Sequence, residues 1–305
     1  MANVRDRQLS QLTAQQAVVL REEAATAKAV AAAYEQARRD LLAEFMERVA
    51  LLGPNPTPGQ LRTLSNDAAL IRAMTNRLAQ LEQQLGAIIG DSLGDSSTAA
   101  FEAAVAEIAQ LAAAAGAGVF EFGFNDLVEL TIRPAIDQIP DLVAAVRAGL
   151  LADMRAGLAA GERIGDLAGR LFSSQAGPFP RGATSAQLMT RRAVIQADNN
   201  AKLLYYERAQ AQLPDLQKQV IAKTGSARTT DLCLRAHGQI RDLDEPFSLS
   251  GTPDPFARQM QQPPFHWNCR TSVAAYLPQF DAASNMTTRS MRAQASKELE
   301  ARADE

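Results

Sequence analysis

Apolar residues recur at helical spacing over most of the first 212 residues. Residues 9–52 are rich in Ala, Gln, Glu, Arg and Leu and contain no Gly or Pro before Gly53-Pro54, which is typical of one long helix. The end of this segment carries an apolar stripe: Leu41, Phe45, Val49 and Leu52. A helix with such a stripe needs a partner surface.

A second helix is predicted at or shortly after Thr57-Pro58-Gly59-Gln60, which has a hydroxyl at the N-cap, Pro at the first helical position and Gln at the third. Its apolar seam alternates spacings of three and four: Ile71, Met74, Leu78, Leu81, Leu85 and Ile88. The seam predicts a helical hairpin or short coiled coil. We expect Gly90 to Ser97 to break it, and a further helix over 98–115.

Helical periodicity returns at Asn125 and continues to Leu171, with Pro134 and Pro140 as starts or kinks. Residues 173–183 are predicted to form a loop because Ser, Gly and Pro dominate them. Thr184 or Ser185 is then expected to cap a helix that ends near Gln212.

The pattern of apolar and polar residues changes after Gln212. Three short segments have strand character, and Pro, Gly and Asp fill the spaces between them: 219–222, 239–243 and 271–276. The predicted fold is mainly α, with a long-helix N-terminal region followed by a small α+β C-terminal module. The expected domains are a helical region, the module, and a flexible or frayed helical tail: 1–160, 161–280 and 281–305.

Composition narrows the function classes. The chain has 305 residues, of which 47% are apolar and 21% charged, and its formal net charge is −3. A near-neutral chain is not expected to coat nucleic acid by charge alone. No apolar run approaches the roughly 20 residues that cross a bilayer, and no apolar core follows the first charges, so neither a membrane span nor a secretory signal is expected.

The chain holds only two Cys and two His, and all four lie between Cys233 and Cys269. They form Cys233-x3-His237 and, after 28 intervening residues, His266-x2-Cys269, with the single Trp267 inside the second pair. Two close pairs separated by a loop suit tetrahedral zinc, whose preferred ligands include thiolate and imidazole. A module with a thin core could gain folding free energy from such an ion. Since all Cys and His would be used in a closed shell, the zinc would be structural and the chain not an enzyme.

Other interpretations stay open. Cys233 and Cys269 could be small buried apolar side chains, and the two histidines could be satisfied by local hydrogen bonds. A disulfide between the cysteines is less expected in a reducing cytoplasm.

Two segments resemble the phage head morphogenesis family of MuF-type minor head proteins. They are residues 224–239, a Cys-containing turn ending in His-Gly-Gln, and residues 263–270, Pro-Pro-Phe-His-Trp-Asn-Cys-Arg. Residues 190–201 also resemble the family's Arg-Thr-Glu helix, although Arg191-Arg192 replaces part of that motif. In many members the first pair of metal-binding residues is Cys-x-x-Cys. Here Thr230 stands at the earlier of these two positions and Cys233 at the later one. The family's metal site would therefore be kept by His237 or lost.

The resemblance covers about residues 160–277 and implies a structural minor capsid protein of a tailed phage. Such a protein would be assembled in the host cytoplasm and retained inside the head near the portal, in more than one copy, with a role in head assembly or DNA ejection. The implied partners are the portal protein, the major capsid or scaffolding protein, and packaged double-stranded DNA, and the helical region 1–160 would serve assembly and portal docking while zinc could stabilise the module. No membrane partner is expected.

Charge is uneven along the chain. Residues 181–241 contain ten Lys or Arg against four Asp or Glu, a net of +6, whereas residues 1–180 have a net of −6. This asymmetry favours an alternative function, a nucleic-acid-binding zinc module that contacts packaged DNA near the portal. The candidate contacts to DNA or portal are Arg181, Arg191, Arg192, Lys202, Arg208, Lys218, Lys223 and Arg228. A solvated helix face explains the same residues, and a metal-dependent hydrolase ranks third.

Overall fold

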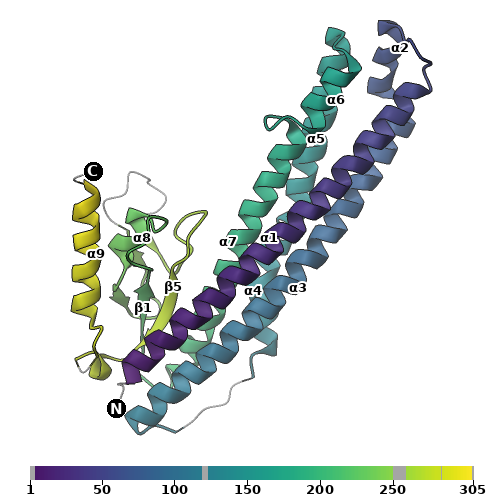
Figure 1. The fold of residues 1–305 in the computed structure, drawn as a ribbon. Coiled ribbons are helices and arrows are strands. Elements are labelled where there is room, and N and C mark those ends of the chain that lie inside the picture. The colour runs from purple at the N-terminus through teal and green to yellow at the C-terminus, as the bar shows by residue number, and fades with distance from the viewer. Residues whose placement is uncertain (1–3, 119–122, 250–258, 283, 304–305) are drawn as a thin grey trace. The chain divides into compact units, whose positions relative to one another are not determined.

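The computed structural model of the protein describes residues 4–118, 123–249, 259–282 and 284–303 (Figure 1). Its helices are α1 (Val4–Ala50), α2 (Pro58–Thr63), α3 (Ala68–Ala115), α4 (Asn125–Ile136), α5 (Ile139–Ala160), α6 (Ile164–Phe172), α7 (Pro178–Ala209), α8 (Asp231–Ala236) and α9 (Thr288–Ala303). Its strands are β1 (Gln217–Ile221), β2 (Ile240–Arg241), β3 (Phe247–Ser248), β4 (Gln259–Met260) and β5 (Ser272–Tyr276). The expected class, long helices followed by a small region of short strands, is confirmed.

The chain divides into two compact units, each assembled from segments that are separate in sequence. Unit 1 consists of Met1–Ala24, Ser92–Arg133 and Arg191–Glu305. Unit 2 consists of Ala25–Asp91 and Pro134–Thr190. Helices α1, α3, α4 and α7 contribute residues to both units.

Unit 2 has an aromatic core on the stripe predicted for α1. Phe45 of α1 is fully buried, and its ring centroid lies 6.3 Å from that of Phe172 in α6. Phe172 lies 6.4 Å from Phe179 of α7, which meets the ring of Tyr34 edge-on at 5.4 Å. The predicted seam on α3 is buried at Met74, Leu78, Leu81 and Leu85. The helices of unit 2 therefore pack through the periodic apolar positions.

Helix α3 runs without interruption through residues 90–97, so the predicted break there is wrong. A Cβ atom on Gly90 would lie 3.4 Å from Cδ1 of Ile136 in α4, an ordinary contact distance, so the two helices pack together at this glycine without requiring it. The hydroxyls of Ser97 and Thr131 are 2.6 Å apart in the buried interface. These contacts offset the cost of about 1 kcal/mol that a glycine imposes on a helix relative to alanine.

Helix α7 begins at Pro178, before the predicted cap at Thr184 or Ser185. The first turn of a helix tolerates proline because its first N–H groups have no partner inside the helix. The backbone N–H of Arg181 already donates to the carbonyl of Gly177 at 3.1 Å. The loop that sequence placed at 173–183 is therefore shorter, since its prolines belong to the helix.

The sheet of unit 1 is antiparallel, with strand order β2-β1-β5. Val220 of β1 pairs with Val273 of β5, and both side chains are fully buried. These three strands overlap the three segments predicted to be extended, although β1 begins two residues before its predicted segment, and the short pair of β3 and β4 was not predicted. Side chains from α3 and α7 complete the core, including Phe101 and Tyr205.

A buried polar cluster ties the start of α1 to β5. The carbonyl of Ala275 accepts hydrogen bonds from Nη1 of Arg5 at 3.1 Å and from Nε2 of Gln8 at 2.6 Å. The backbone N–H of Ala275 donates to Oε1 of Glu107 at 3.1 Å, and Glu107 also accepts from Gln8 and from the hydroxyl of Tyr206. Burial raises the pKa of Glu107 and the pKa of Tyr206. The cluster fixes α1, α3, α7 and β5 together inside unit 1.

The segment expected to be a frayed helix or flexible tail contains α9, which packs alongside α8 (Figure 1). Met291 and Ala295 of α9 are buried. Arg302 anchors its end by donating to the carbonyls of Thr229 and Ser226 and by pairing with Asp231 at 2.9 Å.

Helix α3 is also long and apolar enough to span a membrane by length and composition, a test that core helices of soluble proteins pass as well. The expected absence of a membrane partner stays a prediction.

Candidate metal centre

Three of the four scarce residues meet at one point in unit 1. Thr230 caps α8 by accepting a hydrogen bond from the N–H of Cys233, which places the Cys233 side chain in the first turn. His266 and Cys269 come from a turn before β5, in which the N–H of Cys269 donates to the carbonyl of His266 at 3.1 Å. Sγ of Cys233 lies 3.1 Å from Nε2 of His266 and 3.6 Å from Sγ of Cys269.

The donor set and its spacing fit a metal ion. Around a tetrahedral zinc, bond lengths of about 2.3 Å to sulfur and 2.0 Å to nitrogen place two sulfurs about 3.8 Å apart and a sulfur and nitrogen about 3.5 Å apart. The three donor atoms lie within 4.8 Å of one another, close to this geometry. Both cysteines are free, so a disulfide does not occupy the site. Cys233, His266 and Cys269 could therefore hold a metal ion through three ligands.

The two thiols differ in acidity. The hydrogen bond with Cys269, together with burial, raises the pKa of Cys233. Burial also opposes ionisation of Cys269, but hydrogen bonds from Cys233, His266 and Thr271 outweigh it and hold the pKa of that thiol well below its usual range. The pair therefore favours one thiolate at Cys269, which is the form that binds metal.

His237 is not part of the group, which corrects the expected four-residue set. It ends α8, and its Nδ1 accepts a hydrogen bond from the N–H of Ala222 at 3.0 Å. Burial, reinforced by Arg292, lowers the pKa of His237 to about 4. The imidazole is therefore neutral and carries its proton on Nε2, and it acts as a buried link between α8 and β1.

Two hydroxyls stand beside the three ligands. Oγ1 of Thr230 lies 3.1 Å from Nε2 of His266, and Thr271 hydrogen-bonds to both cysteines. A hydroxyl or a water is thus available for the fourth corner of a tetrahedral site. Trp267, expected inside the site, is instead 56% exposed, and the guanidinium of Arg192 lies 5.1 Å from its ring centroid.

The eight basic residues proposed to contact DNA or portal do not share one environment. Lys202 and Lys218 are buried, so neither can touch a partner, which corrects that expectation. Lys202 pairs with Asp198 at 2.8 Å, and Nζ of Lys218 donates to the carbonyl of Leu243 at 2.7 Å. Burial lowers the pKa of Lys218 to about 8.

Two more of the eight are held in ion pairs. Arg191 lies 3.5 Å from Glu23, and Arg208 lies 2.9 Å from Asp126. The remaining four are exposed: Arg181, Arg192, Lys223 and Arg228.

Sequence reasoning missed Thr271 and the arginines around α8, β2 and α9. Thr271 follows the second pair by only two positions, but a lone threonine carries no metal-binding signal in a sequence. Arg235 and Arg241 lie within the basic segment 181–241, whereas Arg292 lies in the segment assigned to the tail. Only the fold brings them together.

Comparisons with protein-family models, with curated proteins and with solved structures gave no match to this chain.

Proposed function

We propose that the chain is a structural, non-enzymatic minor head protein of a tailed bacteriophage that acts with the portal in head assembly or genome delivery. The observation that carries the proposal is the meeting of two sequence segments at one site. Residues 224–239 and 263–270 carry the resemblance to MuF-type proteins, and they supply Cys233 on one side and His266 and Cys269 on the other. Head assembly in the host cytoplasm and retention inside the virion follow from the same resemblance.

The proposed metal is a structural zinc. Cys233, His266 and Cys269 would be its protein ligands, and the hydroxyl of Thr230 or a water would fill the fourth corner. Bound zinc would act as a crosslink between α8 and the turn before β5, two segments that share no strand pairing. A structural role rests on the burial of both cysteines, since three protein ligands with a water at the fourth corner would by themselves equally match a catalytic zinc.

Zinc content tests the metal assignment. Elemental mass spectrometry of freshly purified protein should find about one zinc per chain. Cys233→Ser should lose it, and His237→Asn should retain it, because His237 bonds to Ala222 instead of joining the group. The ligand set would be contradicted if His237→Asn lost its zinc while Cys233→Ser still bound zinc.

Portal binding tests the head-protein assignment. The tagged chain is co-expressed with a portal protein from the same genome, and the purified material is analysed by size-exclusion chromatography with light scattering. We expect a stable complex containing several copies of the chain per portal ring. Purification of the folded, zinc-loaded chain without any portal protein would overturn the proposal.

A further inference from the structure

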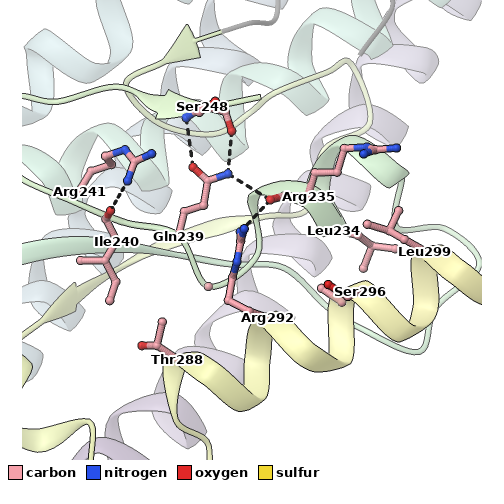
Figure 2. Close-up of a pocket in the computed structure, with 12 residues that line it drawn as sticks. Leu234, Arg235, Gln239, Ile240, Arg241, Ser248, Thr288, Arg292, Ser296 and Leu299 are labelled. Atoms are coloured by element: carbon pink, nitrogen blue, oxygen red, sulfur yellow. Dashed lines mark hydrogen bonds between the residues drawn. The ribbon is translucent and has the colours of Figure 1, made fainter. Parts of the chain in front are cut away.

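A pocket of about 600 Å³ in unit 1 lies between α8, β2, β3 and α9 (Figure 2). Three arginines from three elements line it: Arg235 of α8, Arg241 of β2 and Arg292 of α9. None of its lining residues carries a carboxylate. Among the described residues, none of these arginines forms an ion pair, so the pocket holds uncompensated positive charge.

Each guanidinium keeps donors free for a ligand. Nη1 of Arg292 donates to the carbonyl of Arg235 at 2.9 Å, which fixes the Arg292 side chain across the pocket. Nη1 of Arg241 donates to the carbonyl of Ile240 at 2.8 Å. Since a guanidinium has five N–H groups, most donors of both residues stay available. Arg235 is exposed, and the hydroxyl of Ser296 adds a polar group on α9.

The pocket wall is held in place by Gln239. Its Nε2 donates to the carbonyls of Ser248 at 2.6 Å and Arg235 at 3.1 Å, and its Oε1 accepts from the N–H of Ser248 at 3.1 Å (Figure 2). These bonds connect α8 to β3 through one side chain. A fixed wall lowers the entropy lost when a ligand binds.

Neighbouring carboxylates are engaged elsewhere. Asp242, next to Arg241 in sequence, accepts a hydrogen bond from Gln217 at 2.7 Å. Glu298, six residues after Arg292 on α9, pairs with Arg302 at 2.5 Å and accepts from the N–H of Gly225 at 2.7 Å. Among the described residues, Glu298 is thus balanced by Arg302, whereas Asp242 keeps its charge beside Arg241, and the three arginines of the pocket outnumber it.

The arrangement favours an extended chain of phosphates. Figure 2 shows Arg292 between Arg241 and Arg235, whose guanidiniums lie on opposite sides of the view. Spread guanidiniums suit successive phosphates better than one small anion, which would need them to converge. The lining residues include no aromatic side chain on which a base could stack.

We propose that this pocket binds the phosphate backbone of a nucleic-acid strand, without sequence preference, through Arg235, Arg241 and Arg292. The site is distinct from the metal group and from the eight basic residues that the sequence suggested. It also goes beyond the proposed head-protein function, because it needs no portal contact. Three phosphate contacts predict that the logarithm of the binding constant falls with the logarithm of salt concentration with a slope of about −2.7.

The test measures fluorescence anisotropy of a labelled short DNA duplex with the full-length chain, between about 50 and 200 mM salt. The double variant Arg235→Gln/Arg241→Gln should bind at least about tenfold more weakly and should lower the steepness of the salt slope by about two. Arg292 is kept, because it also supports the backbone of α8. Arg62→Gln/Arg155→Gln is the matched control, since it removes the same charge at exposed positions of unit 2 and should bind as wild type.

Equal binding by the pocket variant and the control variant would overturn the proposal.

A competition experiment against the labelled duplex distinguishes the possible sources of the phosphate. Inorganic phosphate and a mononucleotide, each added at constant ionic strength, should not displace the duplex. Displacement by either would instead assign the pocket to a small phosphate ligand and overturn the nucleic-acid proposal. All variants retain Cys233, His266 and Cys269, so the result is independent of zinc content and portal binding.

Discussion

The hydroxyl of Thr230 lies 3.1 Å from Nε2 of His266. Thr230 therefore stands beside the metal-binding group, three residues before Cys233. Thr230 also has a structural role, because its hydroxyl accepts a hydrogen bond from the N–H of Cys233 and caps the start of α8.

Thr230→Cys is expected to raise zinc affinity at least about tenfold, or about 1.4 kcal/mol, because a thiolate would replace a weakly coordinating hydroxyl. Competition with a chromogenic chelator measures the change. Thr230→Ser, which keeps the hydroxyl, should bind zinc as wild type does. An unchanged affinity in Thr230→Cys would show that position 230 does not face the fourth corner of the site.

Removal of the metal is expected to loosen unit 1 and to leave unit 2 intact. The crosslink between α8 and the turn before β5 disappears, so amide hydrogens of β1 and β5 should exchange faster after chelation. Amides of α5, which lies in unit 2, should keep their rates. Hydrogen exchange followed by mass spectrometry reads both regions, and Cys269→Ser should reproduce the effect without a chelator. Equal acceleration in α5 would contradict the expected localisation.

His237 is expected to make stability depend on pH in the acid range. Burial lowers its pKa from 6.5 to about 4, so the folded state favours the neutral imidazole. Its contribution is fully present above pH 6.5, and it is lost as the pH falls from 6.5 towards 4, because the unfolded state takes up the proton first. The full loss is on the order of 3 kcal/mol.

Urea unfolding at a series of pH values measures this dependence at saturating zinc. His237→Asn offers a carbonyl to the N–H of Ala222 but does not titrate, so the difference between variant and wild type isolates the histidine. A difference that stays constant from pH 7 to pH 4.5 would contradict the assignment, since the pKa lies at about 4.

Asp198→Ala is expected to destabilise unit 1 by about 3–5 kcal/mol, because it leaves the buried ammonium of Lys202 without its counterion. Nζ of Lys202 lies 2.8 Å from Asp198 and 2.9 Å from the hydroxyl of Ser272. The double variant Asp198→Leu/Lys202→Met should recover much of this loss, since it removes both charges. Chemical denaturation gives the comparison, and a double variant as unstable as Asp198→Ala would mean that packing dominates over charge.

Local patterns predicted most of the elements because each pattern has a local cause. The stripe of α1 and the three paired strands depend on residue spacing alone. The break at 90–97 in α3 was predicted wrongly because the packing that supports the helix there comes from α4, as the hydrogen-bonded hydroxyls of Ser97 and Thr131 show. Helix α9 was underestimated for a similar reason: only Met291 and Ala295 are buried, too few to form a visible stripe.

The metal group was predictable in part because Cys and His are scarce. Spacing identified Cys233, His266 and Cys269, but it also included His237, since sequence does not show that the chain turns towards Ala222 at the end of α8. The contacts of Glu107 with Gln8 and Tyr206 had no sequence signal, because the partners are each 99 residues away.

The hydrogen bonds of Ala275 with Arg5, Gln8 and Glu107 constrain how the chain folds during synthesis. A ribosome makes Arg5 270 residues before Ala275. Until β5 has emerged, these early polar groups have no strand to bind. All segments of unit 2 end at Thr190, so they leave the ribosome before β1 does. Unit 2 can therefore fold while β5 is still being made, whereas unit 1 completes its fold only after β5 has emerged.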